Sequence, residues 1–293
     1  MKSAAIGLAL IFGLGLGQGA SLAAEGQVAV VAAENFYGDI ARQIGGDRVA
    51  VISIMNNPDQ DPHLFETTPA VVRRLAGAQI VVLNGANYDP WMDKLLAAVP
   101  RAGRTVISAA QITGRKAGDN PHLWYEPVTM PSVATALAGA LAKTDSAHAS
   151  DYAARLKATL AALERITERV AQIKAKHAGT AVTATEPVFG PMTEALGLTM
   201  RNQRFQLAMM NDTEPSARDV AAFEKDLREH KVKVLIYNSQ VSEKLTERLR
   251  DVATKAKVPV VGVTETMPPN VSFQDWVLGE LDALDKALSE PNS

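Results

Sequence analysis

The stretch SAHASDYAARLKATLAALERITERVAQIKAKH, residues 146–177, decides the fold of this 293-residue chain. Its apolar residues recur every three or four positions, so they lie on one face of a single helix. They are Tyr152, Leu156, Leu160, Leu163, Ile166, Val170 and Ile173. About 30 residues without Pro or Gly, each rising about 1.5 Å, predict a rod of roughly 45 Å. We expect it to pack along its own protein. The alternative is the seam of a coiled-coil dimer, which the many alanines make weaker.

Strand and helix patterns alternate on both sides of this rod. The predicted strands before it are 28–31, 49–54, 80–83 and 105–108, and those after it are 180–185, 199–202, 232–237 and 258–263. Alternation of this kind is typical of parallel sheets. The sequence therefore predicts an α/β fold of two lobes with mainly parallel sheets flanked by helices, bridged by one long helix. The predicted divisions are an N-terminal lobe at 24–145, the linking helix at 146–178 and a C-terminal lobe at 179–293.

The first 23 residues have the pattern of an export signal. Lys2 precedes an apolar run from Ala4 to Leu16, and Ser21-Leu22-Ala23 fits a signal-peptidase site, with cleavage after Ala24 as the alternative. The apolar run is shorter than the ~20 residues that span a bilayer, which argues against a membrane anchor. We therefore expect a cleaved signal peptide and a soluble exported protein.

Charge and cysteine content limit the kinds of partner and site. The chain has 30 Lys and Arg against 32 Asp and Glu, and it has no cysteine. Balanced charge argues against nucleic acid or an anionic membrane as a partner. The lack of cysteine excludes disulfides, thiolate metal sites, cysteine nucleophiles and a lipid anchor on an N-terminal cysteine. A metal would have to be held by nitrogen and oxygen.

Polar side chains follow several of the predicted strands, where ligands bind in open parallel sheets. His63 ends the loop after strand 49–54, and His122 follows strand 105–108. Glu186 comes directly after strand 180–185, and Glu265 follows strand 258–263. Imidazole nitrogens and carboxylate oxygens suit a divalent transition metal, and two carboxylates balance its charge. The sequence thus predicts a metal site of His63, His122, Glu186 and Glu265.

Each of these four residues also has a simpler interpretation. His63 and His122 both follow proline and could be turn residues. Glu186 starts a helix, where it could merely complement the helix dipole. Glu265 could be a solvated loop charge. Trp124 is close enough to His122 in sequence to form a wall of the site.

The chain carries no common catalytic motif. It lacks G-x-S-x-G, H-E-x-x-H, a P-loop and a G-x-G-x-x-G after a strand. We therefore do not expect an enzyme. One alternative is a secreted zinc-dependent hydrolase with Glu66 as the general base. Another is a siderophore or corrinoid binding protein, although 5% aromatic residues do not favour a broad aromatic cleft.

Several longer motifs resemble the substrate-binding proteins of zinc and manganese ABC importers. They are Phe36-Tyr37-Gly38-Asp39-Ile40, Asp61-Pro62-His63-Leu64-Phe65-Glu66, Val82-Leu83-Asn84-Gly85-Ala86, Asn120-Pro121-His122-Leu123-Trp124, Glu186-Pro187-Val188-Phe189-Gly190 and Glu214-Pro215-Ser216. The resemblance covers essentially all of the chain beyond the predicted signal peptide, and the two Pro-His motifs are its most specific part.

The resemblance implies one metal between two lobes that a rigid helix bridges. It assigns the first two ligands to His63 and His122 and the third to Glu186. The fourth is commonly an Asp, where this chain has Glu265, and water or a bidentate Glu186 is the alternative. Residues 111–119 contain no histidine, so no accessory metal-collecting loop is expected.

The resemblance also implies a periplasmic carrier that delivers its metal to a membrane permease. We expect it to be a monomer without a lipid anchor. Two histidines with two carboxylates resemble manganese-type members, whereas zinc binds a given site more tightly. We therefore expect zinc or manganese as the transported ligand, with zinc slightly favoured.

Overall fold

The computed structural model describes residues 26–57, 65, 67–241 and 243–291. The predicted signal peptide, residues 1–23, lies outside the described residues, and so do His63 and Glu66.

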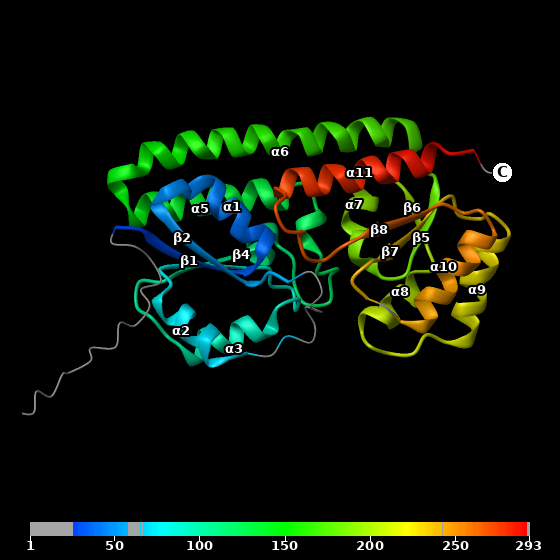
Figure 1. The fold of residues 1–293 in the computed structure, drawn as a ribbon, viewed down its shortest axis with the longest axis horizontal. Coiled ribbons are helices and arrows are strands. Elements are labelled where there is room, and N and C mark those ends of the chain that lie inside the picture. The colour runs from blue at the N-terminus through cyan, green and yellow to red at the C-terminus, as the bar shows by residue number, and fades with distance from the viewer. Residues whose placement is uncertain (1–25, 58–64, 66, 242, 292–293) are drawn as a thin grey trace, which may run out of the picture.

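The first lobe is built on a four-stranded parallel sheet in the order β2-β1-β3-β4. Its strands are β1 (Val28–Glu34), β2 (Val49–Met55), β3 (Ile80–Leu83) and β4 (Thr105–Ser108). Side chains of β1 alternate between two cores. Val30 and Ala32 face the core with α1 (Asn35–Gly45) and α5 (Thr129–Thr144), and Val31 and Ala33 face α2 (Pro69–Gly77) and α3 (Pro90–Ala98). Helices thus cover both faces of the sheet (Figure 1).

The long helix α6 (Ala149–His177) begins after a 3₁₀ turn at Ser146–His148. The predicted apolar face is the buried one, because Tyr152, Leu163, Ile166, Val170 and Ile173 are all at most 7% exposed. This face packs on α5, α1 and α11 (Phe273–Ser289) of the same chain and is not left open as a dimer seam. Figure 1 shows α6 running along both lobes.

The second lobe repeats the arrangement of the first, with strand order β6-β5-β7-β8 and parallel pairing throughout. Its strands are β5 (Ala181–Ala184), β6 (Thr199–Arg201), β7 (Leu235–Asn238) and β8 (Val260–Val263). Its helices are α7 (Gly190–Ala195), α8 (Gln203–Met210), α9 (Ala217–Arg228), α10 (Lys244–Lys255) and α11 (Phe273–Ser289).

The last helix, α11, does not stay within the second lobe. It begins beside α1 of the first lobe and runs along α6 (Figure 1). The predicted fold class, two lobes with parallel sheets flanked by helices and one long helix, is confirmed.

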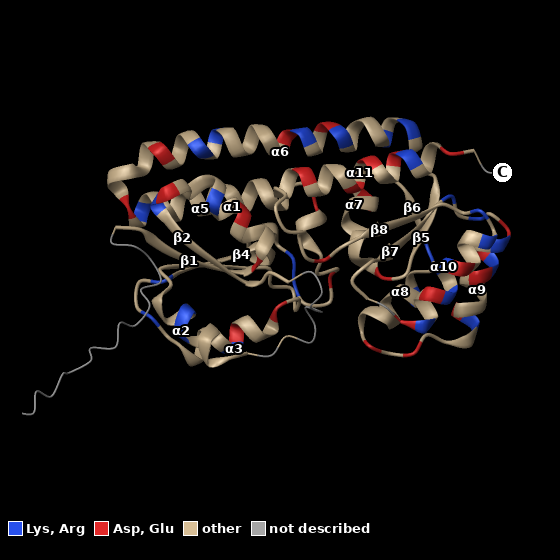
Figure 2. Ribbon diagram, viewed as in Figure 1, with Lys and Arg blue, Asp and Glu red and all other residues tan. Residues whose placement is uncertain are grey.

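Some predicted boundaries differ from those observed. Strand β1 extends three residues beyond Val31, to Glu34, and β7 ends at Asn238 rather than Tyr237. The helices α5 and α8 were not predicted. None of the described helices is long and apolar enough to cross a membrane. Figure 2 shows acidic and basic residues interspersed along α6, α9 and α10.

Candidate metal centre

Three of the four predicted ligands lie in the described part of the chain, and all three are buried. The exposed fraction is 1% for His122, 9% for Glu186 and 2% for Glu265. This burial is contrary to the interpretations of His122 as an exposed turn residue and of Glu265 as a solvated charge.

The His122 ring is oriented by Asn120. Asn120 Oδ1 accepts a bond from His122 N at 3.0 Å and lies 2.8 Å from His122 Nδ1. The amide orientation is set because Asn120 Nδ2 donates to Pro187 O at 2.8 Å. An amide oxygen only accepts, so His122 Nδ1 carries a proton, and in the neutral ring the lone pair is on Nε2. That is the tautomer a metal ligand needs, with the outer partner that ligating histidines usually have.

Asn120 also connects the two lobes at the site. Its acceptor Pro187 follows Glu186 directly in the chain. The Asn120 side chain therefore bonds both to the backbone of His122 and to the backbone next to Glu186. Gly190 leaves room for this contact, because a Cβ there would lie 2.6 Å from Asn120 Nδ2. Asn120 therefore contacts the Glu186-Pro187-Val188-Phe189-Gly190 motif at both Pro187 and Gly190.

The two predicted acidic ligands, Glu186 and Glu265, are joined by Asn238, which sequence reasoning missed. Asn238 Nδ2 donates to Glu186 Oε2 at 2.8 Å and to Glu265 Oε1 at 2.7 Å. The other oxygen of that carboxylate, Glu265 Oε2, lies 3.4 Å from His122 Nε2. His122, Glu265 and Glu186 are thus linked in one buried group, with the imidazole nitrogen directed at a carboxylate oxygen.

Further donors hold Glu265 in place. Tyr88, buried in the first lobe, donates from its hydroxyl to Glu265 Oε2 at 3.1 Å. Gln240 Oε1 accepts from the backbone N–H groups of Glu265 and Thr266. Burial, followed by the nearby Glu265 and Glu34 carboxylates, raises the pKa of Tyr88 well above its usual range, so Tyr88 stays a donor.

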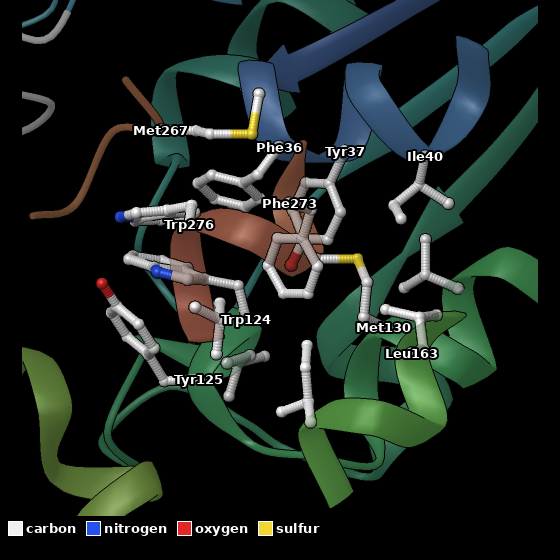
Figure 3. Packing of buried hydrophobic residues seen from close by; sticks show 14 of the residues in the cluster. Phe36, Tyr37, Ile40, Trp124, Tyr125, Met130, Leu163, Met267, Phe273 and Trp276 are labelled. Atoms are coloured by element: carbon white, nitrogen blue, oxygen red, sulfur yellow. The ribbon is translucent and has the colours of Figure 1, made fainter. Parts of the chain in front are cut away.

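Aromatic side chains form the wall behind His122, as predicted for Trp124. The His122 and Trp124 ring centroids are 5.3 Å apart, and those of His122 and Tyr88 are 5.9 Å apart. Figure 3 shows Trp124 packed near Phe36, Tyr125 and Trp276. This wall keeps water from one side of the imidazole.

A second acidic pair, Glu34 and Asp89, lies close to Tyr88 in the first lobe. Glu34 ends β1, is 3% exposed, and neither carboxylate oxygen has a hydrogen-bond partner among the described residues. Burial, with a contribution from Asp89, raises the pKa of Glu34 well above its usual range. Burial also raises the pKa of Asp89 to about 6. The predicted strand ended at Val31, three residues too early to place Glu34 at a strand end.

A small pocket of about 30 Å³ reaches the ligands from the second lobe. His122 and Glu186 line it together with Met209, Met210, Asp212, Val241 and Glu243. Asp212 and Glu243 are exposed, so two carboxylates stand at the outer part of the pocket. A pocket of this volume is closer to the size of an ion or a water molecule than to that of an organic ligand.

The donor set of the described ligands, one imidazole and two carboxylates, suits a divalent transition metal. Within the described ranges no three histidine or acidic side chains are already arranged as a complete metal-holding group. The remaining predicted ligand, His63, lies outside those ranges.

Comparisons with known proteins agree with this chemistry. The family model described as zinc-uptake complex component A, periplasmic, matches residues 30–287. The iron-binding protein YfeA of Yersinia pestis is 26% identical over 220 residues, 70% of this chain and 68% of that protein. The manganese-binding lipoprotein MntA of Bacillus subtilis is 26% identical over 236 residues, 77% of this chain and 75% of that protein.

Solved structures share the fold. The periplasmic zinc-binding protein TroA of Treponema pallidum superimposes with a TM-score of 0.76 at 20% identity, over 90% of this chain and all of that one. None of these matches supports the hydrolase or the siderophore alternative.

Proposed function

The chain belongs to the family of periplasmic zinc-uptake components, and from this premise we propose that it captures a divalent transition metal and delivers it to the permease of an ABC importer. The proposed ligands are His63, His122, Glu186 and Glu265. The metal is cargo, so the protein binds and releases it and performs no bond chemistry.

The observation that carries the proposal is the burial and linkage of the three described ligands. Burying carboxylates is costly unless a partner compensates their charge, and a divalent cation between Glu186 and Glu265 would do so. Asn120 holds His122 in the tautomer that leaves Nε2 available. These features favour a metal over an organic ligand.

The identity of the metal follows less directly from the donor set. Family relatives carry names that specify iron, manganese or zinc. We propose zinc, with manganese as the second choice, because zinc binds a given nitrogen and oxygen site more tightly. Two carboxylates make the site hard enough for manganese as well.

We propose a periplasmic protein without a lipid anchor, because the chain has no cysteine to carry one, although some relatives are named lipoproteins. We also propose a monomer, with lobes at 24–145 and 179–293 and the linking helix at 146–178.

A calorimetric titration of chelator-treated protein with zinc and with manganese tests the function. We expect one metal per chain, and more than about 100-fold weaker binding for His122→Ala and for Glu186→Gln, since changes behind the ligands alone cost about 10–100-fold. His230→Asn is the matched control, because His230 is exposed on the second lobe. If neither metal binds the unchanged protein, the proposed function is wrong.

A further inference from the structure

Helix α1 presents a row of three polar side chains to the other lobe. Asn35, Asp39 and Gln43 are four residues apart, so they lie one above another on a single helix face. Each of them bonds to the segment between Glu265 and the first turn of α11. The metal site described above does not account for this row.

The side-chain amide of Asn35 bonds to both backbone groups of one residue of that segment, Met267. Asn35 Nδ2 donates to Met267 O at 2.7 Å, and Met267 N donates to Asn35 Oδ1 at 3.1 Å. Both residues are buried, at 7% and 5% exposed. A buried backbone group without such a partner would carry a desolvation penalty, so the pair fixes the path of the chain two residues after Glu265.

The next two members of the row hold the start of α11. Asp39 Oδ2 accepts from Phe273 N at 3.0 Å, which is one of the N–H groups that a helix start leaves without an internal partner. Gln43 and Gln274 exchange two amide hydrogen bonds, each 2.9 Å long. The segment from Met267 to Gln274 is therefore tied to α1 at both of its ends.

Other groups of the first lobe hold the residues just before Met267. Tyr88 donates to Glu265 Oε2, and the Tyr125 hydroxyl lies 2.6 Å from Thr264 O. Phe36 of α1 packs against Trp276 of α11 with ring centroids 6.0 Å apart, and Figure 3 shows Met267 next to Phe36. Glu265 follows a strand of the second lobe, where Asn238 and Gln240 bond to it, and its carboxylate also accepts from Tyr88 of the first lobe.

We propose that Asn35, Asp39 and Gln43 are positioning residues that fix Glu265 to the first lobe, through the segment from Met267 to Gln274. Glu265 then keeps its place next to His122 when the lobes move. Glu186 is the ligand that the second lobe brings, with Asn238 beside it. Release of the metal would break the bonds that Asn238 and Gln240 make to Glu265, separate Glu186 from the other ligands and leave Glu265 next to His122. This inference rests on the proposed function, because it takes Glu265 to be a ligand.

A double-mutant cycle on zinc affinity tests the proposal. The four proteins are the unchanged chain, Asn35→Ala, Glu265→Gln and the double variant, each measured by chelator competition and by thermal melting of the chelator-treated form. We expect Asn35→Ala to weaken zinc binding about 10-fold in the unchanged chain but less than about 2-fold in the Glu265→Gln background. The melting temperature should fall equally in both backgrounds.

A matched control separates positioning from general loss of stability. Gln79 Oε1 accepts from Ala29 N within the first lobe, so Gln79→Ala removes a side-chain to backbone bond without touching the Glu265 segment. We expect it to lower the melting temperature and leave the zinc affinity unchanged. If Asn35→Ala cannot be purified, Asn35→Ser, which keeps a hydrogen-bonding oxygen, takes its place in the cycle.

The outcomes distinguish the positioning role from the function. If Asn35→Ala weakens zinc binding by the same factor in both backgrounds, the effect does not pass through Glu265 and the positioning role is wrong. If Glu265→Gln leaves zinc affinity unchanged, Glu265 is not a ligand and the positioning role fails with it, while binding by the unchanged protein still supports the carrier function. If the unchanged protein binds no metal, the function itself fails.

Discussion

At the scale of single residues, Glu280 of α11 shows how a buried carboxyl can be fully hydrogen-bonded without a charge. Its Oε1 accepts from Trp276 Nε1 at 2.9 Å and from Thr264 N at 3.1 Å, and its Oε2 lies 2.7 Å from the Tyr125 hydroxyl. That hydroxyl also lies 2.6 Å from Thr264 O, and its single proton can serve only one of the two acceptors. A protonated Glu280 resolves this, by donating to Tyr125 while Tyr125 donates to Thr264 O.

The protonation of Glu280 predicts how stability depends on pH. Burial raises the pKa of Glu280 from 4.5 to about 8, against the lowering effect of its hydrogen bonds. Between these two pH values Glu280 holds a proton in the folded protein that it has lost in the unfolded chain. The contribution of Glu280 to the free energy of unfolding is therefore complete below about pH 4.5 and is lost as the pH rises through about 8. Glu280→Gln imitates the protonated form, so we expect it to gain stability relative to the unchanged protein as the pH rises, on the order of a few kcal/mol above pH 8.

Urea unfolding of chelator-treated protein at several pH values between 5 and about 9 measures this difference. Other buried acids such as Glu34 and Asp89 also contribute a pH dependence, but they are the same in both proteins. Only the difference between the two curves is therefore diagnostic. Parallel curves would mean that Glu280 is already ionised in the folded state.

Residue positions at the site could be predicted wherever a polar side chain follows an evident strand. His122, Glu186 and Glu265 were predicted in this way, and the structure buries all three. Asn238 and Glu34 were missed because each is the last residue of its strand, and the apolar run that predicted the strand ends before it. A buried polar residue closing an apolar strand is the signal that would have identified them.

At the scale of elements, the loops after α8 and β7 form the outer part of the pocket that reaches His122 and Glu186. Asp212 follows α8, and Glu243 precedes α10. Two exposed carboxylates around a narrow pocket raise the local concentration of cations and therefore the association rate. They lie outside the predicted ligand set, so they are expected to affect the dissociation rate little.

We predict that the double variant Asp212→Asn, Glu243→Gln binds zinc roughly 2- to 10-fold more slowly at low salt, with an unchanged dissociation rate. The difference should shrink in about 0.5 M salt, because exposed charges are screened. Stopped-flow mixing with a fluorescent zinc chelator gives both rates. The control is Glu164→Gln, Glu168→Gln, which removes the same charge from exposed positions on α6. Equal slowing by both double variants would show that only net charge matters.

Helices with a clear apolar stripe and a clear start were predicted closely. The sequence predicts a helix around Pro90–Ala98, which is where α3 lies. It also predicts a helix that begins at Pro69 after a Thr68 cap, and α2 begins in this way. α5 was missed although its buried apolar residues, from Met130 to Leu141, recur at helical spacing, because the alanines among them leave the edges of the apolar face indistinct.

At the scale of the whole molecule, the largest apolar core extends across both lobes. One continuous cluster includes Val30 and Ile80 of the first sheet, Leu163 of α6, and Val182 and Ile236 of the second sheet. Two smaller clusters stay within one lobe each, one beneath α2 and α3 and the other beneath α8, α9 and α10. The sequence predicted two lobes joined by a helix, but such a core depends on contacts between distant segments that no local pattern shows.

A shared core predicts that the two lobes unfold together. Loss of either lobe would expose the apolar faces of α6 and α11, which pack along both lobes. We therefore expect a single calorimetric transition for the chelator-treated protein, with the van't Hoff enthalpy close to the calorimetric enthalpy. Zinc should raise its midpoint without splitting it, because the metal binds only the folded state. Arg169 joins α6 to α11 through ion pairs with Asp282 and Asp285. Arg169→Ala removes these pairs, so it should lower the midpoint and leave one transition. Two separate transitions in the unchanged protein would mean that the lobes are independent folding units joined only by the helix.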